Sequence, residues 1–321
     1  MWSRPAQRSR TAAAFVALAL LAGCSGGKGK EPARPLGARI ERRLDPVDLM
    51  PADLDLVLRL DLGRMRAGIG PSLAQSIADR ALASPAHDVL LSSLPCADVL
   101  WLGARAGDID GGDHVIVLEG KSCAPEAKMR EWSRIGAANA QVTIFTHQGE
   151  VPRAGTAEVI ALSPRATAFV SPVERDSVRR LLREGPDPKH GDPRAEGLLS
   201  LDLRVSRLPP ALEKRFPSIG NILAGVARIR ATAVIVDEGV QLDAEILSPT
   251  VKGAERARDF LRALVETLAE TKYKALLDGV KLEVLDSTLK LRLTVPKALI
   301  LALATSREAP ASAAGPDAGK N

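Results

Sequence analysis

"DLDLVLRLDLGRM" (residues 53–65) alternates leucine with mostly polar residues, and "EGLLSLDLRVSRL" (196–208) carries a similar pattern later in the chain. In the first stretch one face collects only leucines: Leu54, Leu56, Leu58, Leu60 and Leu62. A period of two with one apolar face is typical of an antiparallel strand that has one side exposed. We therefore predict a strand in each stretch, and each strand as the start of a similar unit.

The segments after these two strands follow one order in both halves. Each half continues with a helix, a hairpin, an amphipathic helix, a closing hairpin and a short helix. The ranges are 70–84, 98–119, 125–135, 157–171 and 173–184 in the first half, and 209–225, 227–247, 251–270, 280–295 and 296–305 in the second. The closing hairpins are predicted to turn at Ser163–Arg165 and at Asp286–Ser287.

These patterns predict an α+β fold built from two similar antiparallel-sheet units, β-α-β-β-α-β-β-α, each with its helices packed on one face. The units are expected at 46–185 and 197–306, joined by a linker at 186–196 that is rich in Pro, Gly and charge. One continuous sheet without duplication is the alternative, because the two halves share little identity. The tail 307–321, rich in Ala, Pro and Gly, is predicted to be disordered.

The N-terminus has the pattern of an export signal. Arg4, Arg8 and Arg10 precede the apolar run "TAAAFVALALL" (11–21), which is too short to span a bilayer. The segment Leu21-Ala22-Gly23-Cys24 that follows resembles the lipobox of bacterial lipoproteins. An ordinary signal peptide that happens to contain a cysteine is the alternative.

The lipobox resemblance implies that 1–23 is removed as a lipoprotein signal peptide and that Cys24 is acylated with palmitate or a similar chain. Ser25 follows the cysteine, and in the family a residue other than aspartate there implies the outer membrane. Residues 24–45 then form a flexible tether on the periplasmic side, with exposure at the cell surface left open. The mature chain also resembles an uncharacterised group of predicted envelope lipoproteins of high-GC Gram-negative bacteria, which brings no activity.

Composition narrows the classes of partner. The chain has 44 Lys and Arg against 39 Asp and Glu, and loss of the three signal arginines leaves 41 against 39. Aromatic residues make up only 3% of the chain, and no basic cluster interleaved with aromatics is present. Nucleic-acid binding is therefore not expected. The membrane, through the anchor, and an envelope protein or lipid are the expected partners.

Cys96 and Cys123 remain after Cys24 is acylated, and they flank a predicted hairpin. If the hairpin turns about the Ile109–Asp110 bond, the two cysteines face each other at its open end. The periplasm permits a disulfide. A catalytic or metal-binding pair would need CxxC spacing or nearby histidines, which the sequence lacks.

The sequence contains no motif that assigns chemistry. His87, His114, His147 and His190 are scattered, and no nucleophile elbow, P-loop or dinucleotide fingerprint occurs. We therefore expect no catalytic, cofactor-binding or metal site, and a non-enzymatic envelope protein with a binding or structural role. Two alternatives remain: a carrier or chaperone for lipid or lipoprotein, and a hydrolase in which His114 or His147 meets carboxylates and a hydroxyl.

Overall fold

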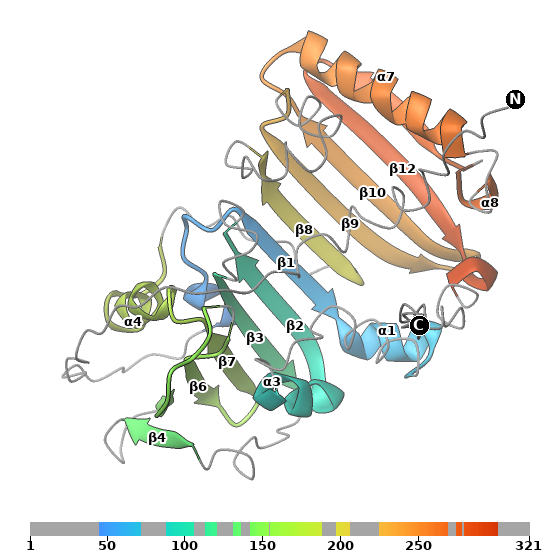
Figure 1. Ribbon diagram of the computed structural model, residues 1–321. Coiled ribbons are helices and arrows are strands. Elements are labelled where there is room, and N and C mark those ends of the chain that lie inside the picture. Colours follow the sequence, from blue (N-terminus) through green and yellow to red (C-terminus); the bar gives the residue numbers. More distant parts are fainter. Residues whose placement is uncertain are drawn as a thin grey trace, which may run out of the picture.

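The structure is a computed structural model of the chain (Figure 1). The structure describes residues 45–71, 88–105, 113–120, 131–135, 142–153, 155–187, 197–205, 225–268, 274–277 and 279–300. The predicted signal peptide, lipobox, tether and tail lie outside these ranges, as do nearly all of 70–84 and all of 209–224.

The strands form one antiparallel sheet of twelve strands in the order β11-β12-β10-β9-β8-β1-β2-β3-β7-β6-β5-β4. The strands of the first half are β1 (Leu56–Asp61), β2 (Ala97–Ala104), β3 (His114–Gly120), β4 (Trp132–Ile135), β5 (Thr143–His147), β6 (Glu158–Ser163) and β7 (Ala166–Val170). Those of the second half are β8 (Leu199–Arg204), β9 (Arg228–Val236), β10 (Gly239–Leu247), β11 (Lys281–Leu285) and β12 (Thr288–Pro296). The antiparallel α+β class is thus observed.

The helices of the described ranges lie at strand ends and on the sheet faces. They include η1 (Pro46–Leu49), α1 (Leu62–Ile69), α3 (Asp88–Ser93), η3 (Leu94–Cys96), α4 (Arg175–Glu184), α7 (Val251–Leu268) and α8 (Lys274–Leu277). Residues 297–300, within the predicted helix 296–305, are also helical. None of these helices has the length and hydropathy needed to cross a membrane.

Several predicted elements are confirmed. Both closing hairpins turn where expected, and Asp286 takes a positive φ of 52° in the second of them. The helices α4 and α7 match the predictions for 173–184 and 251–270 to within a few residues.

One local prediction is wrong. The prediction of a helix at 125–135 fails for Trp132–Ile135, which form β4, because these residues pair with β5 at the sheet edge.

The predicted helix at 70–84 lies almost wholly outside the described residues. Helix α1 was not predicted and begins at Leu62, directly after the first strand. Its start is favoured by Asp61, whose side chain accepts a hydrogen bond of 2.8 Å from the Arg64 backbone N–H.

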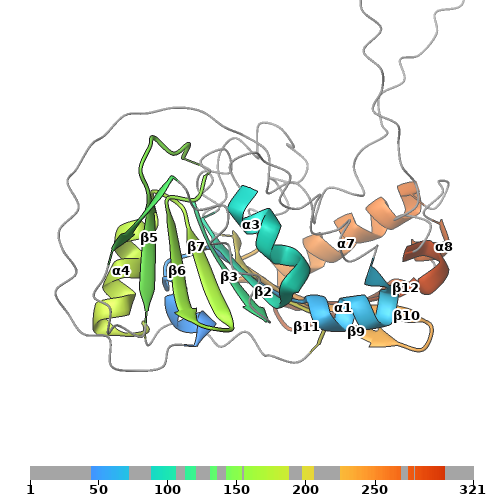
Figure 2. The ribbon, with the colours of Figure 1, turned by 90° about the horizontal axis from the view of Figure 1, so that it is seen from below.

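The two faces of the sheet are covered differently. On one face, which we call the α7 face, α1, α3 and α7 lie on the same side (Figure 2), and side chains such as Leu100, Ile116 and Leu289 pack beneath them. On the other face, the α4 face, α4 and η1 cover β2, β3, β6 and β7 of the first half. The prediction of helices on one face only is therefore wrong for the first half. There β3 has buried side chains on both faces: Val115 and Val117 on the α4 face, and Ile116 and Leu118 on the α7 face.

The predicted boundary between units falls inside the sheet. Strand β1 of the first half pairs directly with β8 of the second, from Leu56↔Leu203 to Leu60↔Leu199. Leu56, Leu58 and Leu60 thus lie beside leucines of β8 on the α7 face, and the sheet continues through the boundary. The prediction that Leu54 shares this face is wrong, because Leu54 precedes the strand and packs with Met50 in the core of the α4 face.

Candidate functional site

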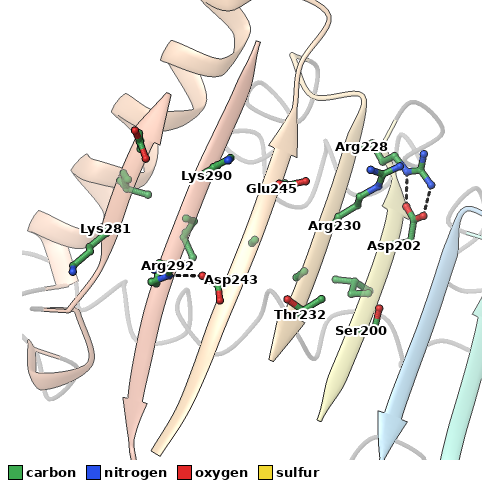
Figure 3. A pocket seen from close by; sticks show the side chains of 16 residues that line it. Ser200, Asp202, Arg228, Arg230, Thr232, Asp243, Glu245, Lys281, Lys290 and Arg292 are labelled. Atoms are coloured by element: carbon green, nitrogen blue, oxygen red, sulfur yellow. Dashed lines mark hydrogen bonds and ion pairs between the residues drawn. The ribbon is translucent and has the colours of Figure 1, made fainter. Parts of the chain in front are cut away.

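The α4 face is open over the second half, where it forms a hollow of about 770 Å³ lined by polar side chains. We call this surface the charged face, and it consists of Ser200, Asp202, Arg228, Arg230, Thr232, Asp243, Glu245, Lys281, Glu283, Lys290 and Arg292 (Figure 3). The side chains come from β8, β9, β10, β12 and β11. Each strand alternates charged residues on this face with apolar residues on the α7 face, so the pleat alone separates the two sets.

The register places these side chains in rows that run across the strands. One row reads Glu283, Lys290, Glu245, Arg230 and Asp202, from β11 to β8. Its signs alternate from one strand to the next, which stabilises cross-strand neighbours in a sheet. A second row reads Lys281, Arg292, Asp243, Thr232 and Ser200.

Two ion pairs neutralise part of the charged face. Arg228 binds both carboxylate oxygens of Asp202, with an Nε to Oδ1 distance of 2.6 Å. This hydrogen bonding raises the pKa of Arg228 above its ordinary value, although burial opposes the shift. The pair is bidentate, a geometry that favours a fixed orientation.

The second ion pair joins Arg292 and Asp243, with Nε to Oδ1 at 2.5 Å, and Gln241 donates to the other oxygen at 2.7 Å. Burial by itself raises the pKa of Asp243, but the hydrogen bonds from Arg292 and Gln241 outweigh it and hold that pKa below its ordinary value. Asp243 is therefore charged at neutral pH.

Five further charges on this face are uncommitted. Among the described residues, Arg230, Glu245, Lys281, Glu283 and Lys290 are exposed and form no ion pair within 4.0 Å. Cations and carboxylates are nearly balanced over the whole face, five to four. A polyanion such as nucleic acid would be repelled by the four carboxylates nearly as much as it is attracted by the five cations. A protein surface that carries both signs of charge can place each charge opposite one of the other sign.

The character of the α4 face changes at β1 and β2. The second row continues through Arg59 of β1, which is only 7% exposed and lies over the Trp101 ring at 5.7 Å. Beyond it, Trp101, Val115 and Val117 are buried beneath α4 and η1. The open charged face thus ends against a layer of helix.

A buried polar network fastens α4 to the first half. Arg179 of α4 binds both oxygens of Glu158, which is fully buried at the start of β6. Burial raises the pKa of Glu158 above its ordinary value, and the hydrogen bonds from Arg179 oppose the shift without cancelling it. Arg105 similarly binds both the buried Glu174 and Asp53, and its Nη1 lies 2.6 Å from Asp53 Oδ2. Hydrogen bonding to Glu174 raises the pKa of Arg105 above its ordinary value. These pairs belong to the packing of the first half.

The predicted site residues are only partly within the described ranges. Cys24 and Cys123 lie outside them. Cys96 is disulfide-bonded and ends η3, directly before β2. Since the chain has three cysteines, its partner is one of the two outside the described residues, and the pairing with Cys123 stays a prediction.

The predicted register of the hairpin is wrong by one residue. It would pair Leu100 with Glu119, whereas the structure pairs Leu100 with Leu118. A β-bulge between Ala97 and Val99 shifts the pairing again, to Ala97↔Gly120. Cys96 lies directly before this shifted pair, at the end of η3.

The histidines are not gathered into a site in the described part of the chain. His114 begins β3 and is buried, and its backbone N–H donates to Ser171 Oγ at 3.1 Å. His147 ends β5, with Nε2 3.2 Å from Glu131 Oε2 and its ring edge against Trp132. Three strand spacings, about 14 Å, separate β3 from β5. His87 and His190 lie outside the described residues, and within those residues no three His, Cys, Asp or Glu side chains are gathered as a metal ion requires.

The residues of the charged face were not predicted as a site. The alternation of charged residues in "RIRATAV", "QLDAEIL" and "LKLRLTV" is visible in the sequence. The pairing of β9 with β10 was predicted as the hairpin 227–247 and is confirmed. The pairing of β10 with β12, which sets Lys290 opposite Glu245, was not predicted.

No protein-family model and no curated protein matches the sequence. Among solved structures, crystal form III of TP0453 is similar, with a TM-score of 0.51 and 10% identity over 81% of this chain and 98% of that one. Crystal forms I and IV of the same protein match with TM-scores of 0.49 and 0.47. At this identity the likeness to form III concerns the fold alone.

Proposed function

We propose that the chain is a lipid-anchored envelope protein without enzymatic activity, which presents the charged face of its sheet to a protein partner. The observation that carries the proposal is the contrast along one face of one sheet. The α4 face is closed by α4 and η1 over the first half and open and charged over the second. Because helices cover the first half of this face and leave the second half exposed, the second half is available for a partner to bind.

The anchor part of this proposal rests on the lipobox resemblance at Cys24 and on Ser25. It is tested by labelling with radioactive palmitate in a Gram-negative host, followed by separation of the two membranes. We expect label in the wild type and none in Cys24→Ser, since acylation requires the thiol. Ser25→Asp should move the protein to the inner-membrane fraction and Ser25→Ala should not. Label in Cys24→Ser would contradict the anchor.

We also propose that the two halves are copies of one unit. Support comes from the strand order outward from the centre, which is β1-β2-β3-β7-β6 in one half and β8-β9-β10-β12-β11 in the other. In each half a hairpin lies next to the first strand in the sheet, and the closing hairpin lies beyond that hairpin, farther from the centre. Strands β4 and β5 are additional in the first half.

A carrier for lipid is the second candidate, and one observation favours it. A hollow of about 430 Å³ lies between α1 and β9, lined mainly by Ala67, Gly68, Leu198, Val234 and Ile235, and the last two side chains are exposed. An acyl chain bound there would protect Ile235 from solvent. Ile235→Asp should then abolish retention of a fluorescent fatty acid, whereas Arg230→Glu on the charged face should leave it unchanged.

A further inference from the structure

We propose that the partner of the charged face is the same face of a second copy of this chain. The two copies are related by a two-fold axis that runs parallel to the strands, between β10 and β12. This inference rests on the docking surface proposed above and names its partner.

The alternating row of charges makes the face complementary to itself. When the two-fold axis lies between two neighbouring strands, each strand of one copy faces a strand of the second copy that is one, three or another odd number of positions away in the strand order. In a row of alternating sign, every charge then meets an opposite one. With the axis between β10 and β12, Lys290 faces Glu245 of the second copy, and Glu283 faces Arg230 of the second copy.

The second row agrees with the same axis. Arg292 faces Asp243 of the second copy, and Lys281 faces Thr232 of the second copy, so no like charges meet. Two sheets that pack face to face keep their strands within about 30° of each other, so facing positions near the axis stay in reach of long side chains.

The helix layer over the first half limits how far inward the axis can lie, and an axis further outward would cover fewer strands. With the axis between β10 and β12, the strands β9, β10, β12 and β11 of one copy cover the same four strands of the other. The edge strand β11 of the second copy then lies over β9, clear of the layer that begins above β2. Moving the axis one strand inward would bring that edge to β1, beside Met50 and Leu54, which pack over Gly103.

In the first row, the charges that would pair between copies form no ion pair within one copy, whereas Arg292 and Asp243 of the second row already bind each other. Arg230, Glu245, Glu283 and Lys290 form no ion pair within the described residues, whereas Asp202 is already held by Arg228. Pairs of this exposed kind are weak and screened by salt. The dimer is therefore expected to weaken as ionic strength rises.

The decisive test is a charge exchange at Glu283 and Arg230. These residues lie three strand spacings apart in one chain, about 14 Å, so they do not pair within it. We expect Arg230→Glu and Glu283→Lys each to weaken dimerisation about tenfold, because each contact occurs twice across the axis. The double variant should recover wild-type association to within about threefold. Sedimentation equilibrium of the purified full-length chain in density-matched detergent measures this, at about 20 mM and about 300 mM salt.

Arg256→Glu is the matched control, since it makes the same change of charge on exposed α7, on the other side of the sheet. It should leave dimerisation unchanged. If a reversed charge prevents folding, the neutral substitutions Arg230→Gln and Glu283→Gln replace it. Each of them should weaken the dimer, and the double variant Arg230→Gln, Glu283→Gln should not recover wild-type association.

Three results would overturn the proposal: a monomer at all concentrations in low salt, a double variant weaker than either single one, or an equal loss in Arg256→Glu. Loss of palmitate labelling with the dimer intact would count against the anchor alone. A monomeric chain that is acylated would count against the second copy alone.

Discussion

Two buried carboxylates of the first half, Glu158 and Glu174, each have an arginine as counter-ion. Glu158 lies beneath α4 with none of its surface exposed, and Arg179 supplies two hydrogen bonds to it. Such a pair contributes little when intact, because removing both groups from water is costly. Breaking it is different, since one charge is then left buried without a partner.

We expect Arg179→Met to lower the free energy of unfolding by about 3–5 kcal/mol at neutral pH. The double variant with Glu158→Gln should recover part of this loss, because no carboxylate is left without its partner. Urea unfolding of the two variants measures both values. A double variant less stable than Arg179→Met would contradict the role of the pair.

The pH dependence follows from the raised pKa of Glu158. The folded chain binds this proton more readily than the unfolded chain, whose carboxyl has an ordinary pKa of 4.5. Stability from this group is therefore fully present below pH 4.5 and is lost as the pH rises through the folded-state pKa. Replacing Glu158 by Gln should remove that part of the decline, measured as the difference in unfolding free energy between the two proteins from pH 4 to 8. A difference that does not change with pH would contradict the shift.

The prediction for Cys96 is confirmed in part, because the residue is disulfide-bonded but its partner lies outside the described residues. Its disulfide is present, and we predict Cys123 as the partner. Non-reducing peptide mapping of exported protein should find the two peptides linked. Replacing both by Ser should cost about 3–4 kcal/mol, the chain-entropy value for a loop of this length. Free thiols at both positions would contradict the pairing.

At the scale of elements, the hairpins and α7 form for local reasons, and their packing depends on small residues. In α7, Ala254 and Ala257 are buried against Leu289 of β12, which brings the helix close to the sheet. The bulge in β2 likewise depends on Gly120, where a Cβ would lie 2.5 Å from the Cys96 carbonyl oxygen.

We expect Ala257→Leu to destabilise the protein by about 1–3 kcal/mol, because the added carbons have no space between α7 and the sheet. Arg256→Ala, one position away on the exposed side, should change stability by less than about 0.5 kcal/mol. Thermal unfolding of the two variants makes the comparison. Equal effects would show that α7 does not pack as described.

At the scale of the whole molecule, the boundary between the two predicted units is a pair of strands. Leu60 of β1 and Met65 of α1 pack with Leu198 and Ala233 of the second half. The halves therefore share part of a core as well as a sheet.

If the halves are copies, a fragment of residues 196–306 should unfold cooperatively, since α7, β10, β11 and β12 have a core of their own. Its melting temperature should lie below that of the full chain, because the contacts of β8 with β1 are lost. Differential scanning calorimetry tests this. A broad, non-cooperative transition would favour one indivisible domain.

Most of the strands, the closing hairpins and α7 follow from the local sequence, whereas β4 was predicted as a helix and β5 was not predicted. Alternation along "LVLRLD" and the 3.6-residue stripe of α7 are local properties, which depend only on neighbours in the chain. The export signal and the lipobox stay predictions, and they too rest on a short segment of sequence.

Only the tertiary structure decided how these elements combine. The pairing of β1 with β8, the strand formed by 132–135 and the bulge in β2 depend on partners distant in sequence, and a shift of one residue moves every side chain to the other face. The charged face has the same origin. Its residues can be read from the sequence, but the rows of alternating charge exist because register aligns five strands and because α4 and η1 cover the first half of that face and not the second.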